Sequence, residues 1–153
     1  MCWKCDDKGS TAAYLELVRG KIHDYGWYVQ GVEGDRVHPP WAYTVGLTEH
    51  SRPELVLTGM PLDPAADLLG AEAAYQLFFN DPIAGQRFRL RDGPLVEAVP
   101  VTDPAAHLNT ATALYGTTVS AVQLVHADER GHWPWEPGYR GVRGGQPVLG
   151  PHT

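Results

Sequence analysis

The sequence predicts an α+β fold with a mainly antiparallel sheet of about five to six strands, two to three helices and a long C-terminal loop. Short segments rich in β-branched and aromatic residues alternate with turn signals. Two Asp-Pro pairs stand where helices are expected to start. The strands come as a block, followed by a helix, a hairpin, a helix and a strand, an order typical of α+β proteins.

The first half of the chain begins with a predicted helix over 10–25, with Ser10 as N-cap and Gly26 as terminator. Its apolar residues recur at helical spacing. Segments 27–32, 42–47 and 54–59 are predicted strands. The Pro39-Pro40 pair makes 33–40 a loop. A polar turn over 50–53 joins the last two strands as a hairpin or meander.

The second half begins with a helix predicted from Asp63, as N-cap, to about Phe79. Its candidate core face consists of Leu68, Leu69, Ala73, Leu77 and Phe78. Strands 87–90 and 95–101 flank Asp92-Gly93, a strong hairpin signal. The pair Asp103-Pro104 opens a third helix that ends before Gly116, and 119–127 is the last predicted strand. Residues 129–153 are rich in Gly, Pro and Trp and show no periodicity.

Length and composition predict one soluble domain over 1–153, with a polar lead at 1–9 and the irregular loop at 129–153. The apolar fraction of 43% is ordinary for a globular protein. The net charge of −6 argues against a nucleic-acid partner, which would need a basic face. A local basic patch around Arg140 and Arg143 is still compatible with this net charge.

The chain has no apolar run long enough to cross a membrane and no apolar segment typical of a signal peptide. These features predict a cytoplasmic protein, in which thiols stay reduced. The two cysteines are then free thiols, metal ligands or a redox pair, and a structural disulfide is the least favoured interpretation. The oligomeric state stays open, because a sheet edge can form a dimer.

The first candidate metal ligands are Cys2 and Cys5. A C-x-x-C pair can supply half of a tetrahedral zinc site, because two thiolates from one tight turn reach the same ion. The other two ligands would be His, Asp or Glu residues that folding brings close. A redox pair is less favoured, because the cysteines precede every predicted strand. Two ordinary thiols near the chain terminus are the remaining alternative.

A second group of candidate metal ligands consists of His126, Asp128 and His132. Side chains alternate along a strand, so His126 and Asp128 are expected on the same side where the last strand meets the loop. Two imidazoles and a carboxylate can bind zinc or another transition metal with open positions, or complete the site begun by the cysteines. The alternative is a buried structural histidine and a turn-forming aspartate.

Candidate ligand-binding residues lie in two places. Trp133 and Trp135 flank a proline, and Trp41 follows Pro39-Pro40. Aromatic rings on a backbone stiffened by proline are suited to line a site for a planar ligand or a partner peptide. Tyr139 and Arg140 lie among glycines that allow an anion to approach, although no phosphate-binding loop is present. Around the predicted hairpin, Tyr43 and His50 are further candidates, with His50 and Glu54 as a candidate base and its orienting carboxylate. The alternatives are burial of aromatic area and a solvated tail.

Several segments resemble the bacterial family catalogued as domain of unknown function 4262. The resemblance rests on Gly26-Trp27-Tyr28-Val29-Gln30-Gly31-Val32, on Pro40-Trp41-Ala42-Tyr43-Thr44-Val45-Gly46-Leu47, on Pro53-Glu54-Leu55-Val56-Leu57-Thr58-Gly59, on Asp128-Glu129-Arg130-Gly131-His132-Trp133-Pro134-Trp135 and on Gly144-Gly145-Gln146-Pro147-Val148-Leu149-Gly150. It extends over nearly the whole chain. It implies a single-domain, cytoplasmic bacterial protein and carries no established activity.

Three functions are compatible with these features. The favoured one is a small zinc-binding domain that binds a small molecule or a protein partner. The second is a metal-dependent enzyme that activates water at His126, Asp128 and His132. The third is a metal-free interaction protein, similar to an antitoxin or immunity protein. The sequence has no G-x-S-x-G, H-E-x-x-H or G-x-G-x-x-G motif that would name a reaction.

Overall fold

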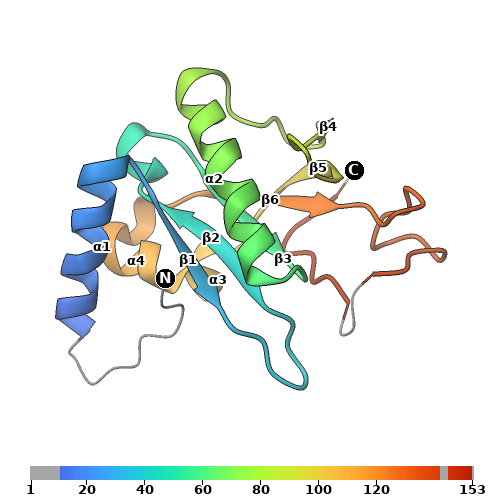
Figure 1. The fold of residues 1–153 in the computed structure, drawn as a ribbon, viewed down its shortest axis with the longest axis horizontal. Helices are drawn as coiled ribbons and strands as arrows, with labels where there is room; N and C mark the ends of the chain where they lie inside the picture. Colours follow the sequence, from blue (N-terminus) through green and yellow to red (C-terminus); the bar gives the residue numbers. More distant parts are fainter. Residues whose placement is uncertain (1–10, 142–144, 153) are drawn as a thin grey trace.

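A six-stranded sheet forms the centre of the protein in a computed structural model that describes residues 11–141 and 145–152 (Figure 1). The strands follow the order β1-β2-β3-β6-β5-β4. They are β1 (Tyr28–Val32), β2 (Trp41–Val45), β3 (Glu54–Thr58), β4 (Arg87–Arg89), β5 (Leu95–Pro100) and β6 (Ala121–His126). The predicted α+β fold is confirmed.

The sheet is mixed, although most neighbouring strands are antiparallel. Strands β1, β2 and β3 form an antiparallel meander, and β4 and β5 form the hairpin predicted from Asp92-Gly93. Strand β6 inserts between β5 and β3, antiparallel to the first and parallel to the second, with Leu55 opposite Val122. The short, edge-forming β4 therefore ends the sheet on one side.

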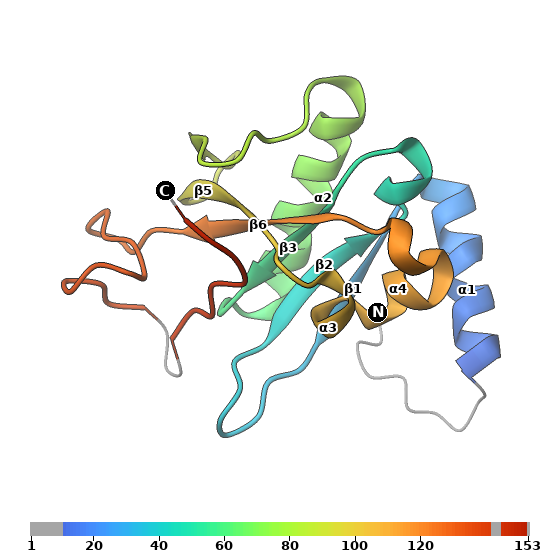
Figure 2. The same ribbon diagram turned by 180° about the vertical axis from the view of Figure 1, so that it is seen from behind.

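Helices cover both faces of the sheet. Helix α2 (Leu62–Phe78) lies on one face, whereas α1 (Thr11–Tyr25), α3 (Pro104–His107) and α4 (Asn109–Tyr115) lie on the other (Figures 1 and 2). Two short 3-10 helices, η1 (Leu47–His50) and η2 (Gly116–Thr118), lie in the connections. Helices and sheet thus form three layers.

Alternation of side chains along the strands creates a core on each face. Leu55 and Leu57 of β3 pack with Leu69 of α2. Val56, the intervening residue, packs on the other side with Val18 of α1. A third buried cluster, containing Val99, Val125, Ala127 and Trp133, lies where the C-terminal residues cover β5 and β6.

The helix predicted after Asp103-Pro104 is broken into α3 and α4, so the protein has four described helices rather than two to three. Leu108 separates them with a non-helical backbone, φ −110° and ψ 66°. Its side chain is fully buried in the core beneath α1. Placing Leu108 in this core requires the change of direction that interrupts the helix.

Two details of α2 correct the sequence prediction. The helix begins at Leu62 after Pro61, so Asp63 lies within the first turn instead of capping it. The predicted core residue Phe78 is 82% exposed, whereas Gln76 is fully buried. Residues Leu69, Ala73 and Gln76 form the buried stripe, and the rotation of 100° per residue turns Phe78 away from it.

The described residues after β6 form turns without a helix or strand. The part before residue 142 extends beyond the end of β6, and the part from residue 145 returns beside β5 (Figure 2). We call residues 127–141 and 145–152 the C-terminal segment. It covers the face of the sheet that also carries α1 and α4, because it packs on Val99 and Val125. None of the helices in the described ranges combines the length and apolar character of a membrane-spanning segment.

Candidate functional site

His126, the last residue of β6, is buried and makes structural contacts. Its ring Nε2 lies 3.0 Å from the carbonyl oxygen of Thr58 on the neighbouring β3. Its backbone amide donates to Oε1 of Gln146 at 2.9 Å, and Nε2 of Gln146 donates to the His126 carbonyl. Burial lowers the pKa of His126 below its ordinary value, although the contact with Thr58 opposes this shift. The imidazole is therefore held in its neutral form at neutral pH.

Asp128 organises the turn that follows β6. Its Oδ1 accepts backbone hydrogen bonds from Arg130 and His132, and its Oδ2 accepts one from Arg140, all within 2.9 Å. Desolvation alone would raise the pKa of Asp128, but these amides and His132 together hold it below its ordinary value. The carboxylate is thus ionised and already occupied by three donors.

His132 lies beside this carboxylate. Its Nδ1 is 3.6 Å from Oδ2 of Asp128, beyond hydrogen-bond distance. The same nitrogen is buried and has no hydrogen-bond partner among the described residues. Nδ1 is therefore a nitrogen with unused hydrogen-bonding capacity next to an anionic oxygen.

An aromatic stack extends along the C-terminal segment. The rings of Trp133 and Trp135 are parallel with centroids 5.7 Å apart, and His152 stacks on Trp135 at 3.8 Å. The guanidinium of Arg87 lies 4.5 Å from the centroid of Trp133 and forms an ion pair with buried Glu97. Trp133 is only 3% exposed, so this part of the stack anchors the segment to β4 and β5.

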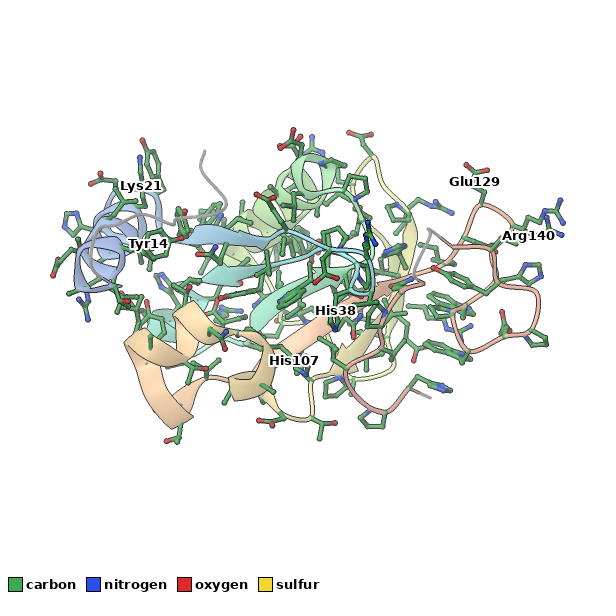
Figure 3. The ribbon with its side chains drawn as sticks, turned by 90° about the horizontal axis from the view of Figure 1, so that it is seen from below. Tyr14, Lys21, His38, His107, Glu129 and Arg140 are labelled. Carbon is green, nitrogen blue, oxygen red and sulfur yellow. The ribbon has the colours of Figure 1, made fainter. Side chains whose placement is uncertain are left out.

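Two glutamines bind the remainder of the C-terminal segment to the sheet. Gln123 donates to the carbonyl of Pro147 and accepts from the amide of Leu149. Gln146 also donates to the hydroxyl of Tyr139 at 2.8 Å. Arg140 and Glu129 lie at the outer end of the segment, away from the sheet (Figure 3). Tyr139 is thus half-buried in the network, whereas the Arg140 side chain is exposed.

The other predicted ligand-binding residues lie apart from this segment. Trp41 donates from Nε1 to the carbonyl of His107 on α3, and the hydroxyl of Tyr43 accepts the amide of Thr110 on α4. His50 is exposed in η1. Glu54 is buried and accepts hydrogen bonds from Thr44, Gly46, Leu47 and Thr48, so it holds η1 in place and does not orient His50.

The proposed zinc ligands are only partly within the described structure. Asp128 and His132 lie together, as described above, whereas the ring of His126 contacts Thr58. No group of three or more His, Cys, Asp or Glu residues within 11–141 and 145–152 could hold a metal ion. Cys2 and Cys5 lie outside the described residues, and the prediction for them stays a prediction.

A groove of about 800 Å³ lies between α2 and the chain that leads from α2 into the β4–β5 hairpin. In Figure 1 this chain runs from the end of α2 across to β4. Seven large apolar side chains are exposed in the described residues, and four of them line this groove. These four are Tyr75, Phe78, Phe79 and Ile83, which are 54%, 82%, 57% and 70% exposed. Clustered exposed apolar side chains are typical of interaction sites.

The charged residues of the groove differ on its two sides. On the α2 side, burial raises the pKa of Glu72, and Asp81 is paired with Arg52 at 3.0 Å. On the β4 side, Arg89 and Arg91 line the groove. Neither forms an ion pair with a described carboxylate, and Arg89 makes only a 3.4 Å contact with the carbonyl of Gly93. The β4 side is therefore basic in a chain of net charge −6.

Strand β4 also has a free edge. Leu90 donates to the Pro94 carbonyl, and Ala98 donates to the Gln86 carbonyl. Because hydrogen-bonding direction alternates along an antiparallel strand, the even-numbered residues of this segment bond to β5. The backbone N–H and C=O groups of Arg87 and Arg89 consequently point away from the sheet.

The groove is not predicted from the sequence. Phe78 is a predicted core residue, and the sequence predicts no role for Tyr75, Phe79 or Ile83. Two signals were present in the chain. Phe78 and Phe79 are adjacent aromatic residues at the predicted end of a helix, directly before the polar pair Asn80-Asp81, and Arg87-Phe88-Arg89-Leu90-Arg91 alternates basic with apolar residues. Such alternation is typical of a strand with one solvated face.

Comparison with protein families matches residues 21–140 to the model described as "Domain of unknown function (DUF4262)". Comparison with curated proteins and with solved structures gives no match. The match includes every element from within α1 to the Asp128 turn, together with the groove residues.

Proposed function

The chain belongs to the DUF4262 family, and we propose that it is a binding module that docks a protein partner in the groove between α2 and β4. The observation that carries the proposal is the collection of Tyr75, Phe78, Phe79 and Ile83 in one groove. Scattered apolar residues are ordinary on a protein surface, but a contiguous set usually marks an interaction site.

The local contacts of these side chains support the proposal. Tyr75 stacks on Phe79 with centroids 4.5 Å apart, which orders the two rings before any partner arrives. Arg52 donates to the carbonyl of Phe79 and pairs with Asp81, so the end of α2 is tied to the connection between η1 and β3. A pre-ordered aromatic surface loses little conformational entropy on binding and therefore suits a specific interaction.

Photocrosslinking tests this function. A benzophenone amino acid replaces Ile83 in the full chain, and the matched control carries it at Val37, which is 74% exposed in the loop between β1 and β2. We expect discrete crosslinked partners from position 83 that are missing from position 37. Adding Phe78→Ser to the position-83 protein should remove them, since Phe78 lies in the same groove. The same products from both positions, or none from position 83, would contradict the proposal.

Zinc binding is a second proposal, favoured by one observation. We propose that His132 Nδ1 and Asp128 Oδ2, 3.6 Å apart, share an ion with Cys2 and Cys5. The buried Nδ1 without a described hydrogen-bond partner supports this assignment, as does the spacing of the cysteines. An ion there would be mainly structural, because four protein ligands would close its coordination shell.

Elemental analysis of the purified, untagged protein tests the zinc proposal. We expect near-stoichiometric zinc in the native chain and its loss in the Cys2→Ser, Cys5→Ser double variant. His132→Ala should lower the zinc content as well, whereas His50→Ala, at an exposed site in η1, should not. Metal-free protein after reconstitution under reducing conditions would overturn the proposal.

A further inference from the structure

The groove borders the free edge of β4, and this juxtaposition indicates how a partner would bind. We infer that the protein captures an extended segment of alternating acidic and apolar residues, which pairs with β4 as a seventh strand of the sheet. The inference rests on the proposed function and specifies the chemistry of the partner. Pairing of a partner segment with an exposed sheet edge is a recurrent mode of peptide recognition.

The backbone of β4 supplies the hydrogen bonds. The N–H and C=O groups of Arg87 and Arg89 point outward, as the bonds of Gln86 and Leu90 to β5 require. Strand β5 agrees, because the carbonyl of Leu95 accepts from Ala127 on the β6 side and so is directed away from β4. Both outward-facing residues are exposed, so a segment can approach them.

The two faces of β4 require two kinds of partner side chain. Phe88 packs against the core beneath α2, on the side of the groove. Arg87 lies on the opposite face with Glu97 and Trp133. Arg89 follows Arg87 in the alternation of the strand and lies at the rim, where that face meets the groove. A seventh strand would therefore direct one set of side chains toward the aromatic residues of the groove and the other set alongside Arg87 and the arginines at the groove rim.

The positive charge of the arginines determines which partner side chains can lie alongside them. Arg87 is already paired with Glu97, but Arg89 has no described carboxylate partner, and neither has Arg91 beyond the strand. Carboxylates placed opposite arginines across a strand pair contribute favourably, whereas like charges destabilise the pairing. The partner residues on this face are therefore acidic, and those on the groove face are apolar.

The arginines of β4 also disfavour a second copy of this chain as the occupant. Antiparallel pairing of two β4 strands about Phe88 would place Arg87 of one copy opposite Arg89 of the other. Like charges directly opposite each other oppose such a dimer. The chain's net charge of −6 does not remove this local repulsion. Salt screens the interaction between exposed charges that are more than about 10 Å apart, so distant carboxylates have little effect at β4.

A synthetic peptide tests the inference directly. The probe is a fluorescein-labelled heptapeptide in which glutamate alternates with valine and phenylalanine, and binding to the full chain is measured by fluorescence anisotropy. The matched controls are the same peptide with lysine in place of glutamate, and a peptide of identical composition with its glutamates in one block. We expect the alternating acidic peptide to bind at least about tenfold more tightly than either control.

Variants of the protein give the reciprocal measurement. The double variant Arg89→Glu, Arg91→Glu should lose the acidic peptide and gain the lysine peptide, because both side chains are exposed and neither holds the fold through an ion pair. Hydrogen exchange should slow at the amides of Arg87 and Arg89 when the acidic peptide binds. Unchanged exchange at these amides, or an unaltered preference in the double variant, would overturn the inference.

The outcomes separate this inference from the proposed function. If Ile83 crosslinks a partner but that interaction survives the Arg89→Glu, Arg91→Glu exchange, the groove binds a protein and the strand-pairing inference is wrong. If sedimentation shows that the native chain is a dimer in which the amides of Arg87 and Arg89 already exchange slowly, the occupant is a second copy and the inference is again overturned. Peptide binding with the expected preference supports both the groove and the edge.

Discussion

The guanidinium of Arg87 lies 2.9 Å from the fully buried carboxylate of Glu97 and simultaneously covers the ring of Trp133. Strands β4 and β5 place the two residues directly opposite each other. One arginine thus compensates a buried charge and clamps the first tryptophan of the C-terminal segment. Edge strand and segment are linked through this contact.

Replacing Arg87 with methionine should destabilise the protein by about 1–3 kcal/mol, because a buried carboxylate loses its charged partner. Methionine retains much of the apolar stem that packs on Trp133. The loss of stability therefore measures mainly the removal of the positive charge. The measurement is denaturant unfolding followed by tryptophan fluorescence. As a control, Arg36→Met changes an exposed arginine in the loop between β1 and β2 and should have little effect. Equal stability of both variants would contradict the prediction.

Replacing Asp128 with alanine should loosen the C-terminal segment while leaving the sheet intact. Three backbone amides, those of Arg130, His132 and Arg140, lose their acceptor. We expect hydrogen exchange at these amides to accelerate by about tenfold, with little change in β1 to β3. The control is Glu129→Ala, the exposed neighbouring carboxylate. The same exchange pattern in both variants would show that Asp128 does not organise the turn.

The close approach of the C-terminal segment to β3 can be tested at Gly59. This residue has φ +69°, and a Cβ there would lie 2.9 Å from the carbonyl oxygen of Gly145. Gly131 provides a matched control with φ +84° and open space around the added atom. The positive φ alone should lower the free energy of unfolding of the Gly131→Ala variant by about 1–2 kcal/mol. Gly59→Ala should cost more and should accelerate exchange at Gln146, because the segment must move away.

The order of helices and strands could be predicted from the sequence because it depends on local signals. Asp92 and Gly93 form the predicted turn, with Asp92 at φ +56°, and the hairpin of β4 and β5 follows from it. The parallel pairing of β3 with β6 could not be predicted in this way. Residues such as Leu55 and Val122 are 67 positions apart, and no local pattern specifies that they are neighbours.

The candidate site was harder to predict for a related reason. His126, Asp128 and Trp133 were identified as candidate site residues, and their described contacts are those of residues that fix a turn and cover a sheet. A polar or aromatic residue in a loop has the same sequence pattern whether it binds a ligand or the protein's own backbone. Phe78 is predicted to lie in the core because its apolar character indicates burial. Its exposure depends on how α2 is oriented about its own axis against the sheet, which the sequence pattern does not specify.

The neutral imidazole of His126 predicts how stability depends on pH. Burial lowers the pKa of His126 in the folded protein, with the contact to Thr58 opposing the shift, whereas the unfolded chain retains an ordinary value of about 6.5. Below that value the unfolded state binds more protons than the folded state, so the free energy of unfolding falls as the pH decreases. The contribution of His126 is fully present above pH 6.5 and is lost progressively below it. The slope from this one proton cannot exceed about 1.4 kcal/mol per pH unit.

The variant His126→Gln isolates this effect, because a glutamine amide can still donate a hydrogen bond to the carbonyl of Thr58 but does not titrate. Unfolding free energies of both proteins should be measured by denaturant titration between pH 5 and pH 8, a range above the ordinary pKa of carboxylates. We expect a flatter profile for the variant, with the two curves diverging below pH 6.5. The exposed His23→Gln change is the control, and its profile should parallel that of the native chain. Parallel profiles for native protein and His126→Gln would mean that burial of His126 does not set the acid sensitivity of the fold.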